Sequence, residues 1–180
     1  SIEETARRER YKFFMESAQK HNTSAVAIGH TADDNTETIL HRILRGTGTL
    51  GLGGIPIKRP LVSGSAIQLI RPLLFTWRKE IIEYLREKQF TYRTDASNSE
   101  PIYLRNKIRL ELIPLLENQY NPNIKNLLIQ LCQILNINNE YLISKKKNIL
   151  KASTREEREG SYSIDTYTLT KQPKILQYFA

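Results

Sequence analysis

The sequence has 180 residues, 39% of them hydrophobic, and its 27 Lys and Arg against 19 Asp and Glu give a formal net charge of +8. This apolar content argues against disorder, and the single cysteine, Cys132, excludes a disulfide framework or a cysteine-rich metal site and fits a reducing compartment. No apolar run reaches the roughly 20 residues that span a bilayer, so we expect a soluble protein without a membrane partner, whose positive charge fits either RNA or a merely solubilising surface.

The first 45 residues predict a helix, a strand and a second helix. Residues 1–20 place apolar side chains on one helix face, and residues 25–28 form the short apolar run typical of a central parallel strand covered on both sides. Thr31 followed by Asp34 is close to a capping box, and the apolar stripe after it predicts a helix that ends near Arg45. This order indicates a strand–turn–helix unit of an α/β protein.

Turn residues divide the next segment into short elements. Five glycines between Gly46 and Gly54 let the backbone turn sharply or approach a ligand closely. The expected elements that follow are a hairpin around residues 63–65, a helix capped by Thr76 and running to about Lys88, an edge strand at 90–92, a turn at 95–98, and a basic, then apolar helix over 104–116 that is stopped or kinked at Pro114.

The remaining segment has a different texture. The apolar residues Leu127, Leu128, Leu131, Ile134, Leu135, Tyr141 and Leu142 follow helical spacing and predict an amphipathic helix. The triple-lysine run at 145–147 favours a solvated face, and residues 160–180 look poor in strand. We therefore expect an α/β domain over residues 1–120 and a helical extension or linker over residues 121–180.

The strongest candidate for chemistry is the stretch from Gly29 to Thr38, where a strand hands over to a helix. Ligands of open α/β sheets collect at the carboxyl ends of strands, and helix amides there can bind phosphate. His30 and Asp34 are four residues apart, so Asp34 could orient the imidazole, or both could act on a nucleotide and its metal. The alternative is that the acidic residues only complement the helix dipole; a zinc site is disfavoured by the histidine spacing.

Two basic segments are further candidates. Arg45, Gly46 and Gly48 could bring backbone amides and a guanidinium to a phosphate, although glycine after a helix is more often a cap. Arg105 and Arg109 are four apart, so a helix would project both to one side, either as an RNA backbone clamp or as a solvated basic face.

Several segments together resemble the tRNA(Ile)-lysidine synthetase family of PP-loop ATP pyrophosphatases. The resemblance covers about the first two thirds of the chain and rests on the order and spacing of five motifs. These are Ser1–Arg7 with Arg10-Tyr11, Gly29-His30-x-x-Asp33-Asp34-x-x-Glu37-Thr38, Arg45-Gly46-x-Gly48-x-x-Gly51-Leu52 with Pro56, Arg71-Pro72-Leu73-Leu74, and Asp95-x-x-Asn98 with Leu104-Arg105-Asn106-x-Ile108-Arg109.

The resemblance implies a partial parallel-sheet PP-loop domain that uses ATP and Mg²⁺ to attach L-lysine to C2 of the wobble cytidine of a tRNA(Ile) with a CAU anticodon. Adenylylation of the base precedes displacement of AMP by the lysine amine. His30 and Asp34 would then serve adenylation, and Arg45, Gly46 and Gly48 would line a nucleotide or lysine pocket. Arg105, Asn106 and Arg109 would contact tRNA or organise the site, with Asp95 and Asn98 fixing the local structure.

The family's Ser-Gly-Gly-x-Asp-Ser pyrophosphate loop does not occur in these residues, so we expect it upstream of Ser1 and expect this piece alone to be inactive. A homodimer and a bacterial cytoplasm or plastid stroma are further expectations. The rival interpretations are a PP-loop tRNA thiolation enzyme, which a single cysteine disfavours, and a non-catalytic basic RNA-binding module.

Overall fold

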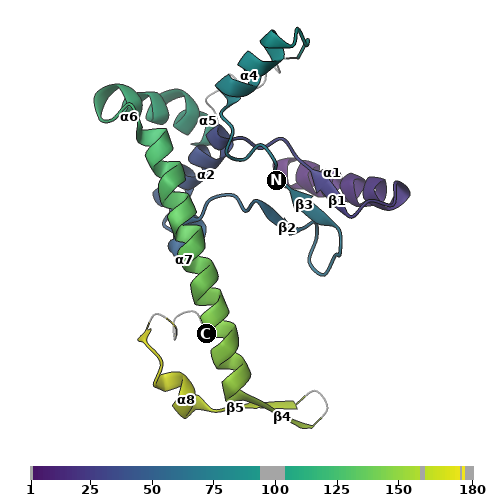
Figure 1. The fold of residues 1–180 in the computed structure, drawn as a ribbon, viewed down its shortest axis with the longest axis vertical. Coiled ribbons are helices and arrows are strands. Elements are labelled where there is room, and N and C mark those ends of the chain that lie inside the picture. Colours follow the sequence, from purple (N-terminus) through teal and green to yellow (C-terminus); the bar gives the residue numbers. More distant parts are fainter. Residues whose placement is uncertain (1, 94–103, 159–160, 175, 177–180) are drawn as a thin grey trace.

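The computed structural model describes residues 2–93, 104–158, 161–174 and 176. Its elements in chain order are α1 (Ile2–Lys20), β1 (Ala25–Ala27), α2 (Ala32–Arg45), α3 (Thr49–Leu52), β2 (Lys58–Pro60), β3 (Gln68–Ile70), α4 (Arg78–Glu87), α5 (Leu104–Lys107), the π-helical turn η2 (Ile108–Leu112), α6 (Ile113–Gln119), α7 (Ile124–Ser153), β4 (Thr154–Arg158), β5 (Ser161–Ile164) and α8 (Thr166–Thr170). Figure 1 shows that the long helix α7 joins the α/β part to the β4–β5 hairpin and α8.

The small sheet of the α/β part has the order β1-β3-β2, with β1 parallel to β3 and β2 antiparallel to it. The predicted hairpin around residues 63–65 is confirmed as β2 and β3. In the described sheet β1 lies at an edge, parallel to β3, with Ala25 and Ala27 exposed, so the described residues do not cover it on both sides as predicted. Alanine residues make a run apolar, but their side chains are small and need not be buried deeply.

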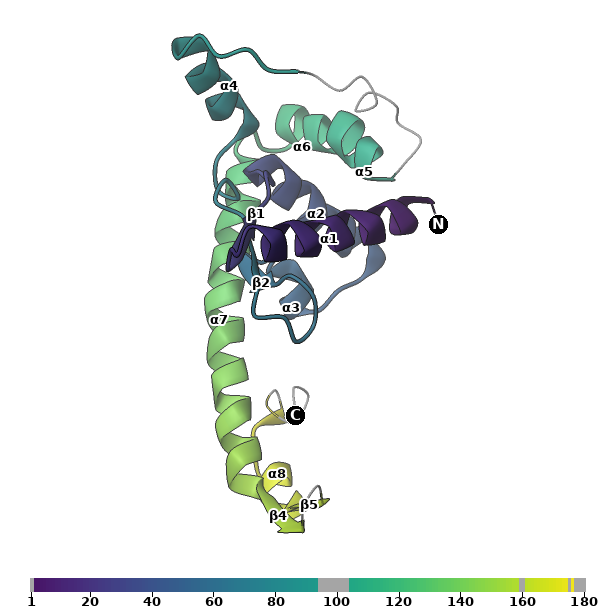
Figure 2. The ribbon, with the colours of Figure 1, turned by 90° about the vertical axis from the view of Figure 1, so that its right-hand side faces the viewer.

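The core lies where α2 packs against η2, α6 and α7. Its buried side chains are Ile39, Leu40, Ile108, Ile113, Leu128 and Cys132. In Figure 2 the sheet and α1 lie beside the upper half of α7, and α4 lies above them. This packing fixes the amino-terminal end of α2, where β1 delivers its following turn, against the helices contributed by residues 104–119.

The helices of the α/β part agree with the sequence in position and differ in detail. The cap of α4 is Trp77 and not Thr76, and the Glu80 carboxylate accepts a hydrogen bond from the Trp77 backbone N–H at 2.6 Å. The edge strand predicted at 90–92 is wrong: these residues form no strand, and Phe90 and Tyr92 are exposed. Their β propensity finds no pairing partner among the described residues.

The helix predicted over residues 104–116 continues past Pro114 to Gln119. Proline has no backbone N–H for the regular helical ladder. The chain passes through the π-helical turn η2 directly before it, and the Ile113 N–H donates to the Ile108 carbonyl. A wider turn at this point accommodates the proline without ending the helix.

The carboxyl-terminal part bears on two expectations. Of the predicted apolar side of α7, Leu128 is buried and Leu135 and Leu142 are half-buried, whereas Leu127, Leu131, Ile134 and Tyr141 are exposed; the buried face also contains Ile129, Cys132 and Asn139. The described part of residues 160–180 contains one short strand, β5, which pairs antiparallel with β4. No helix among the described residues is long and apolar enough to cross a membrane.

Gly54 allows the glycine segment to approach α2 and α7 closely. It has a φ of 67°, and an added Cβ would collide with the side chains of Asn35 and Cys132. The Asn35 Oδ1 accepts from the Ile55 N–H at 2.8 Å, and the Cys132 thiol donates to the Gly53 carbonyl at 2.9 Å. This segment is therefore fixed to the core by buried polar contacts.

Gly54→Ala is expected to lower the free energy of unfolding by about 2 kcal/mol, from the positive φ together with overpacking. Gly48→Ala is the matched control, because Gly48 has a φ of −85° and no atom within 4 Å of an added Cβ. Urea unfolding followed by circular dichroism measures both. Equal stability of the two variants would contradict this account.

Candidate active site

The site begins where the chain leaves β1 and enters α2. Thr31 caps α2: its backbone N–H donates to Asp34 Oδ2 at 2.9 Å, and its hydroxyl donates to the same oxygen at 3.1 Å. The predicted capping box is thereby confirmed. Because it fixes the first turn, it also fixes the directions of Asp34 and of Glu37, one turn further along the helix.

Glu37 is a buried carboxylate bound by two arginines from another part of the chain. Only 1% of its surface is exposed. Arg109 Nε donates to Glu37 Oε1 at 2.6 Å, and Arg105 Nε donates to Glu37 Oε2 at 2.9 Å. Arg109 donates a second hydrogen bond through Nη2 at 3.2 Å, and its contact with Glu37 raises the pKa of Arg109. Planar guanidinium forks hold a carboxylate in one orientation.

Asp34 joins the same cluster. Arg105 Nη2 donates to Asp34 Oδ1 at 2.8 Å, and Arg109 Nη2 lies 3.9 Å from the same oxygen. The expectation that Arg105 and Arg109 project to one side is confirmed. Both guanidiniums are directed at carboxylates of α2.

His30 is bound by Arg71 and not by Asp34. Arg71 Nε donates to His30 Nδ1 at 3.1 Å, while Arg71 Nη1 donates to the Pro56 carbonyl at 2.6 Å. Arg71 is only 5% exposed. Since Nδ1 accepts a hydrogen bond from an always-protonated guanidinium, the neutral imidazole carries its proton on Nε2. His30 is thus arranged to donate from Nε2.

A cleft of about 670 Å³ opens at the amino-terminal end of α2, and His30, Arg71 and Arg105 are not among the residues that line it. Its walls include Thr31, Asp34, Glu37 and Arg109 on one side and Lys125 of α7 on another. Lys125 Nζ lies 3.6 Å from Asp33 Oδ1, whose other oxygen accepts from the Arg78 N–H at the start of α4. The cleft combines these charged groups with apolar side chains of α4 and α6 such as Ile81, Leu85 and Ile113, and it is wide enough for a small molecule or one base.

The glycine segment lies at the other end of α2. Arg45, Gly46 and Gly48 follow the 14-residue helix, so about 20 Å of helix separates them from His30. Gly46 caps α2 with a φ of 78°, and Arg45 is exposed. The structure does not bring these residues to the cleft, and their predicted contact with a nucleotide or lysine stays a prediction.

Sequence reasoning missed Glu37 and Arg71 as site residues. Glu37 falls on the buried stripe of α2, three residues before Leu40, and a carboxylate on an apolar stripe signals a paired charge. Arg71 directly follows β3 and opens the Arg71-Pro72-Leu73-Leu74 motif of the resemblance, but nothing in that motif indicated a contact with His30. Asn106 lies half-buried in α5 between the two arginines, and Asp95 and Asn98 lie outside the described residues.

The pKa of His30 is expected below its ordinary value of 6.5, chiefly because of burial; the charge of Asp34 opposes this shift and that of Arg71 adds to it. As pH falls through 6.5 the unfolded chain takes up the proton first, so folding stability decreases toward the lowered pKa. NMR titration of His30 measures this directly. A midpoint above 6.5 would show that Asp34 dominates instead.

The fold and this cleft define an α/β protein with a charged ligand site at a strand–helix junction. The family model described as a PP-loop domain matches residues 1–116, which is more than half of the chain, and the chain therefore belongs to the PP-loop domain family. The predicted fold class, a PP-loop domain followed by a helical segment, is confirmed.

The chain is similar to several curated bacterial proteins, each named tRNA(Ile)-lysidine synthase. It is 37% identical to the protein of Geobacillus kaustophilus over 97% of this chain and 38% of that protein. Against that of Clostridioides difficile it is 39% identical over 92% of this chain and 34% of the relative, and against that of Nostoc sp. 36% over 97% and 52%. The chain spans a third to a half of the length of these relatives.

Proposed function

We propose that the complete protein is an ATP-dependent ligase that forms lysidine at the wobble cytidine of a tRNA(Ile) with a CAU anticodon. The observation that carries the proposal is the similarity to tRNA(Ile)-lysidine synthases together with the Asp34–Glu37–Arg105–Arg109 cluster, which falls on the motifs of the resemblance. A positive net charge of +8 agrees with an RNA substrate.

The reaction has two steps. The C2 oxygen of cytidine attacks the α-phosphorus of ATP and releases pyrophosphate, and an amine of L-lysine then attacks C2, loses a proton and expels AMP. The first step needs donors for phosphate oxygens, and the second needs an amine that has lost its positive charge. A cleft at the amino-terminal end of α2 suits a site of this kind.

We assign roles to this chain's residues from their contacts. His30 donates from Nε2 to an oxygen of the nucleotide, and Arg71 holds the imidazole for that role. Asp34 lines the cleft and orients a substrate group. Arg105 and Arg109 organise the two carboxylates. Their paired contacts with these carboxylates support this role better than a direct contact with tRNA.

The metal is proposed only as a companion of ATP. Among the side chains that the structure describes, no group of three or more His, Cys, Asp or Glu could hold a metal ion. Mg²⁺ is commonly held by one or two carboxylates together with substrate phosphates. L-lysine as co-substrate, a homodimer, and a bacterial or plastid location belong to the same proposal.

The test is to incubate the complete gene product with a tRNA(Ile) CAU transcript, ATP, Mg²⁺ and L-lysine, and to analyse the nucleosides by mass spectrometry. Lysidine is expected only when every component is present. Binding of the transcript without lysidine or AMP would favour the RNA-binding module. Sulfur incorporation would favour thiolation, which the burial of Cys132 and its raised pKa disfavour.

A further inference from the structure

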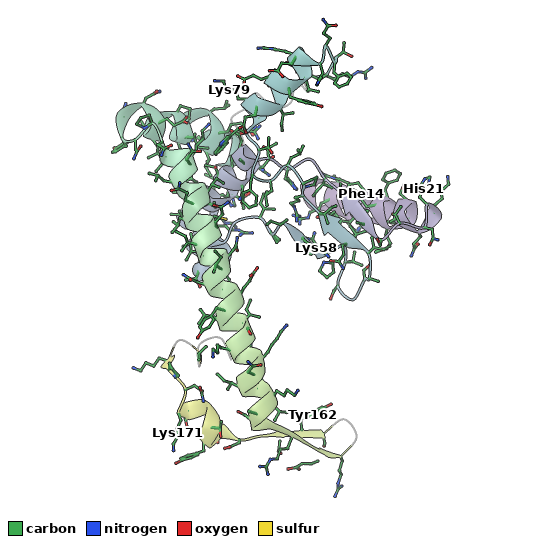
Figure 3. All side chains as sticks on the ribbon, viewed as in Figure 1. Phe14, His21, Lys58, Lys79, Tyr162 and Lys171 are labelled. Atoms are coloured by element: carbon green, nitrogen blue, oxygen red, sulfur yellow. The ribbon has the colours of Figure 1, made fainter. Side chains whose placement is uncertain are left out.

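A basic groove lies between α1 and the β2–β3 hairpin, separate from the cleft described above. It has a volume of about 540 Å³ and is lined by Thr5, Arg7, Arg8, Tyr11, Arg59, Leu61 and Val62. In Figure 3, Phe14 on α1 and Lys58 on β2 mark the two neighbouring elements that form its walls. None of its lining residues lines the cleft beside Asp34.

Tyr11 is held between two guanidinium groups. The Arg7 Cζ lies 5.5 Å from the centre of the Tyr11 ring, and the Arg59 Cζ lies 5.2 Å from it. Arg59 Nη2 also donates to the Tyr11 hydroxyl at 2.6 Å, and Arg59 Nη1 donates to the Pro60 carbonyl at 2.9 Å. Arg59 and the ring are therefore fixed. Arg7 is exposed, and among the described side chains its contact is with the Tyr11 ring.

The groove carries positive charge that the described carboxylates do not balance. Within the described side chains, Arg7 and Arg59 form no ion pair with a carboxylate, and Arg8 has one exposed contact, with Glu9 at 3.5 Å. The charges of Arg59 and Arg7 also reach the buried Arg71, where they add to burial in lowering its pKa. Gathering like charges around one ring costs free energy, which a bound anion would recover.

We propose that this groove binds the phosphate backbone of RNA, with Arg7 and Arg59 contacting phosphodiester oxygens and the Tyr11 edge and its apolar neighbours facing a ribose or base. This inference rests on the proposed function for the identity of the RNA, a tRNA. It assigns a substrate contact to a surface that lies apart from the reacting groups.

The composition of the groove favours RNA over the triphosphate of ATP. An aromatic ring between arginines, next to the apolar Leu61 and Val62, is typical of surfaces that follow a nucleic acid chain, where stacking and phosphate contacts alternate. A triphosphate favours convergent backbone amides or a glycine-rich turn. The lining residues include no glycine.

The test compares Arg7→Gln and Arg59→Gln with Lys20→Gln in the complete gene product. Lys20 is exposed at the other end of α1, and Lys20→Gln removes the same charge as Arg7→Gln. Filter binding of the tRNA(Ile) CAU transcript over a salt series is expected to show about fivefold weaker binding for Arg7→Gln and a salt slope smaller by about 0.7–1, the loss of one phosphate contact. Lys20→Gln is expected to match wild type, and the KM for ATP is expected not to change.

Three results would overturn the proposal: wild-type affinity and salt slope for Arg7→Gln, an equal loss for Lys20→Gln, or a raised KM for ATP with unchanged tRNA binding. Since Arg59 makes internal hydrogen bonds, Arg59→Gln is interpreted only with its melting temperature, and the exposed Arg7 carries the decision. A wild-type protein that binds the transcript but forms no lysidine would refute the proposed function without refuting RNA binding by this groove.

Discussion

Glu37→Gln is expected to lower the free energy of unfolding by about 3 kcal/mol, the lower end of the range for breaking a buried ion pair, because Arg105 is half exposed. The glutamine keeps the shape, but its NH₂ group would face guanidinium donors that need acceptors. Arg109 would lose two hydrogen bonds to a charged partner. Urea unfolding of the variant and of wild type at pH 7.5 measures the difference.

Glu111→Gln is the matched control for this prediction. Glu111 is exposed on η2, two residues after Arg109 in sequence, and the substitution removes the same charge. Its effect is expected within about 0.5 kcal/mol. A loss of similar size in both variants would mean that net charge, and not the paired geometry at Glu37, determines stability.

Asp34→Asn is expected to slow lysidine formation by a factor of about 100 or more, the usual cost of removing one positioned charged group from an active site. The amide can still accept from the Thr31 N–H, so the helix cap is kept and the melting temperature should change little. Arg105 loses its charged partner at Oδ1 but stays bound to Glu37 through Nε. Single-turnover assays with saturating ATP and lysine measure the rate.

Asp33→Asn serves as the comparison, since Asp33 precedes Asp34 directly and contacts Arg78 and Lys125 instead of the two arginines. A much smaller loss of rate is expected. If the two variants lose activity equally, the acidic first turn acts as a whole through its charge, as the helix-dipole interpretation of the sequence holds.

The local features of the site were predictable from the sequence. Thr31 and Asp34 are three apart and satisfy each other within one helical turn, so the cap needs no tertiary information. Arg105 and Arg109 are four apart, and helical geometry alone puts them on one side. These contacts are set by spacing along a single element.

The long-range features were not predictable. Glu37 and its partner Arg109 are 72 residues apart, and His30 and Arg71 are 41 apart, so only the packing of separate elements joins them. The natural expectation that Asp34 orients His30 failed in the structure because the Asp34 oxygens are occupied by Thr31 and Arg105.

The tail shows a different limit. The strand Thr154–Arg158 consists of polar residues, most of them charged, and this pattern predicts neither a buried strand nor a loop. It is paired to β5 by backbone contacts in a hairpin, and hydrophobic periodicity does not detect an exposed hairpin of this kind. In α7 the predicted apolar side was only partly right: Leu128 is buried but Leu127, Leu131 and Tyr141 are exposed, because helical spacing identifies a face but not the neighbour that buries it.

The most direct measurement compares lysidine formation by wild type and His30→Ala, each as the complete gene product, with the melting temperature of each recorded. Wild type is expected to convert the tRNA(Ile) CAU transcript, and His30→Ala is expected to lose nearly all conversion while melting close to wild type, because the role proposed for the imidazole is to donate to the nucleotide. Full conversion by His30→Ala would contradict this site, and absence of lysidine with wild type would contradict the ligase itself.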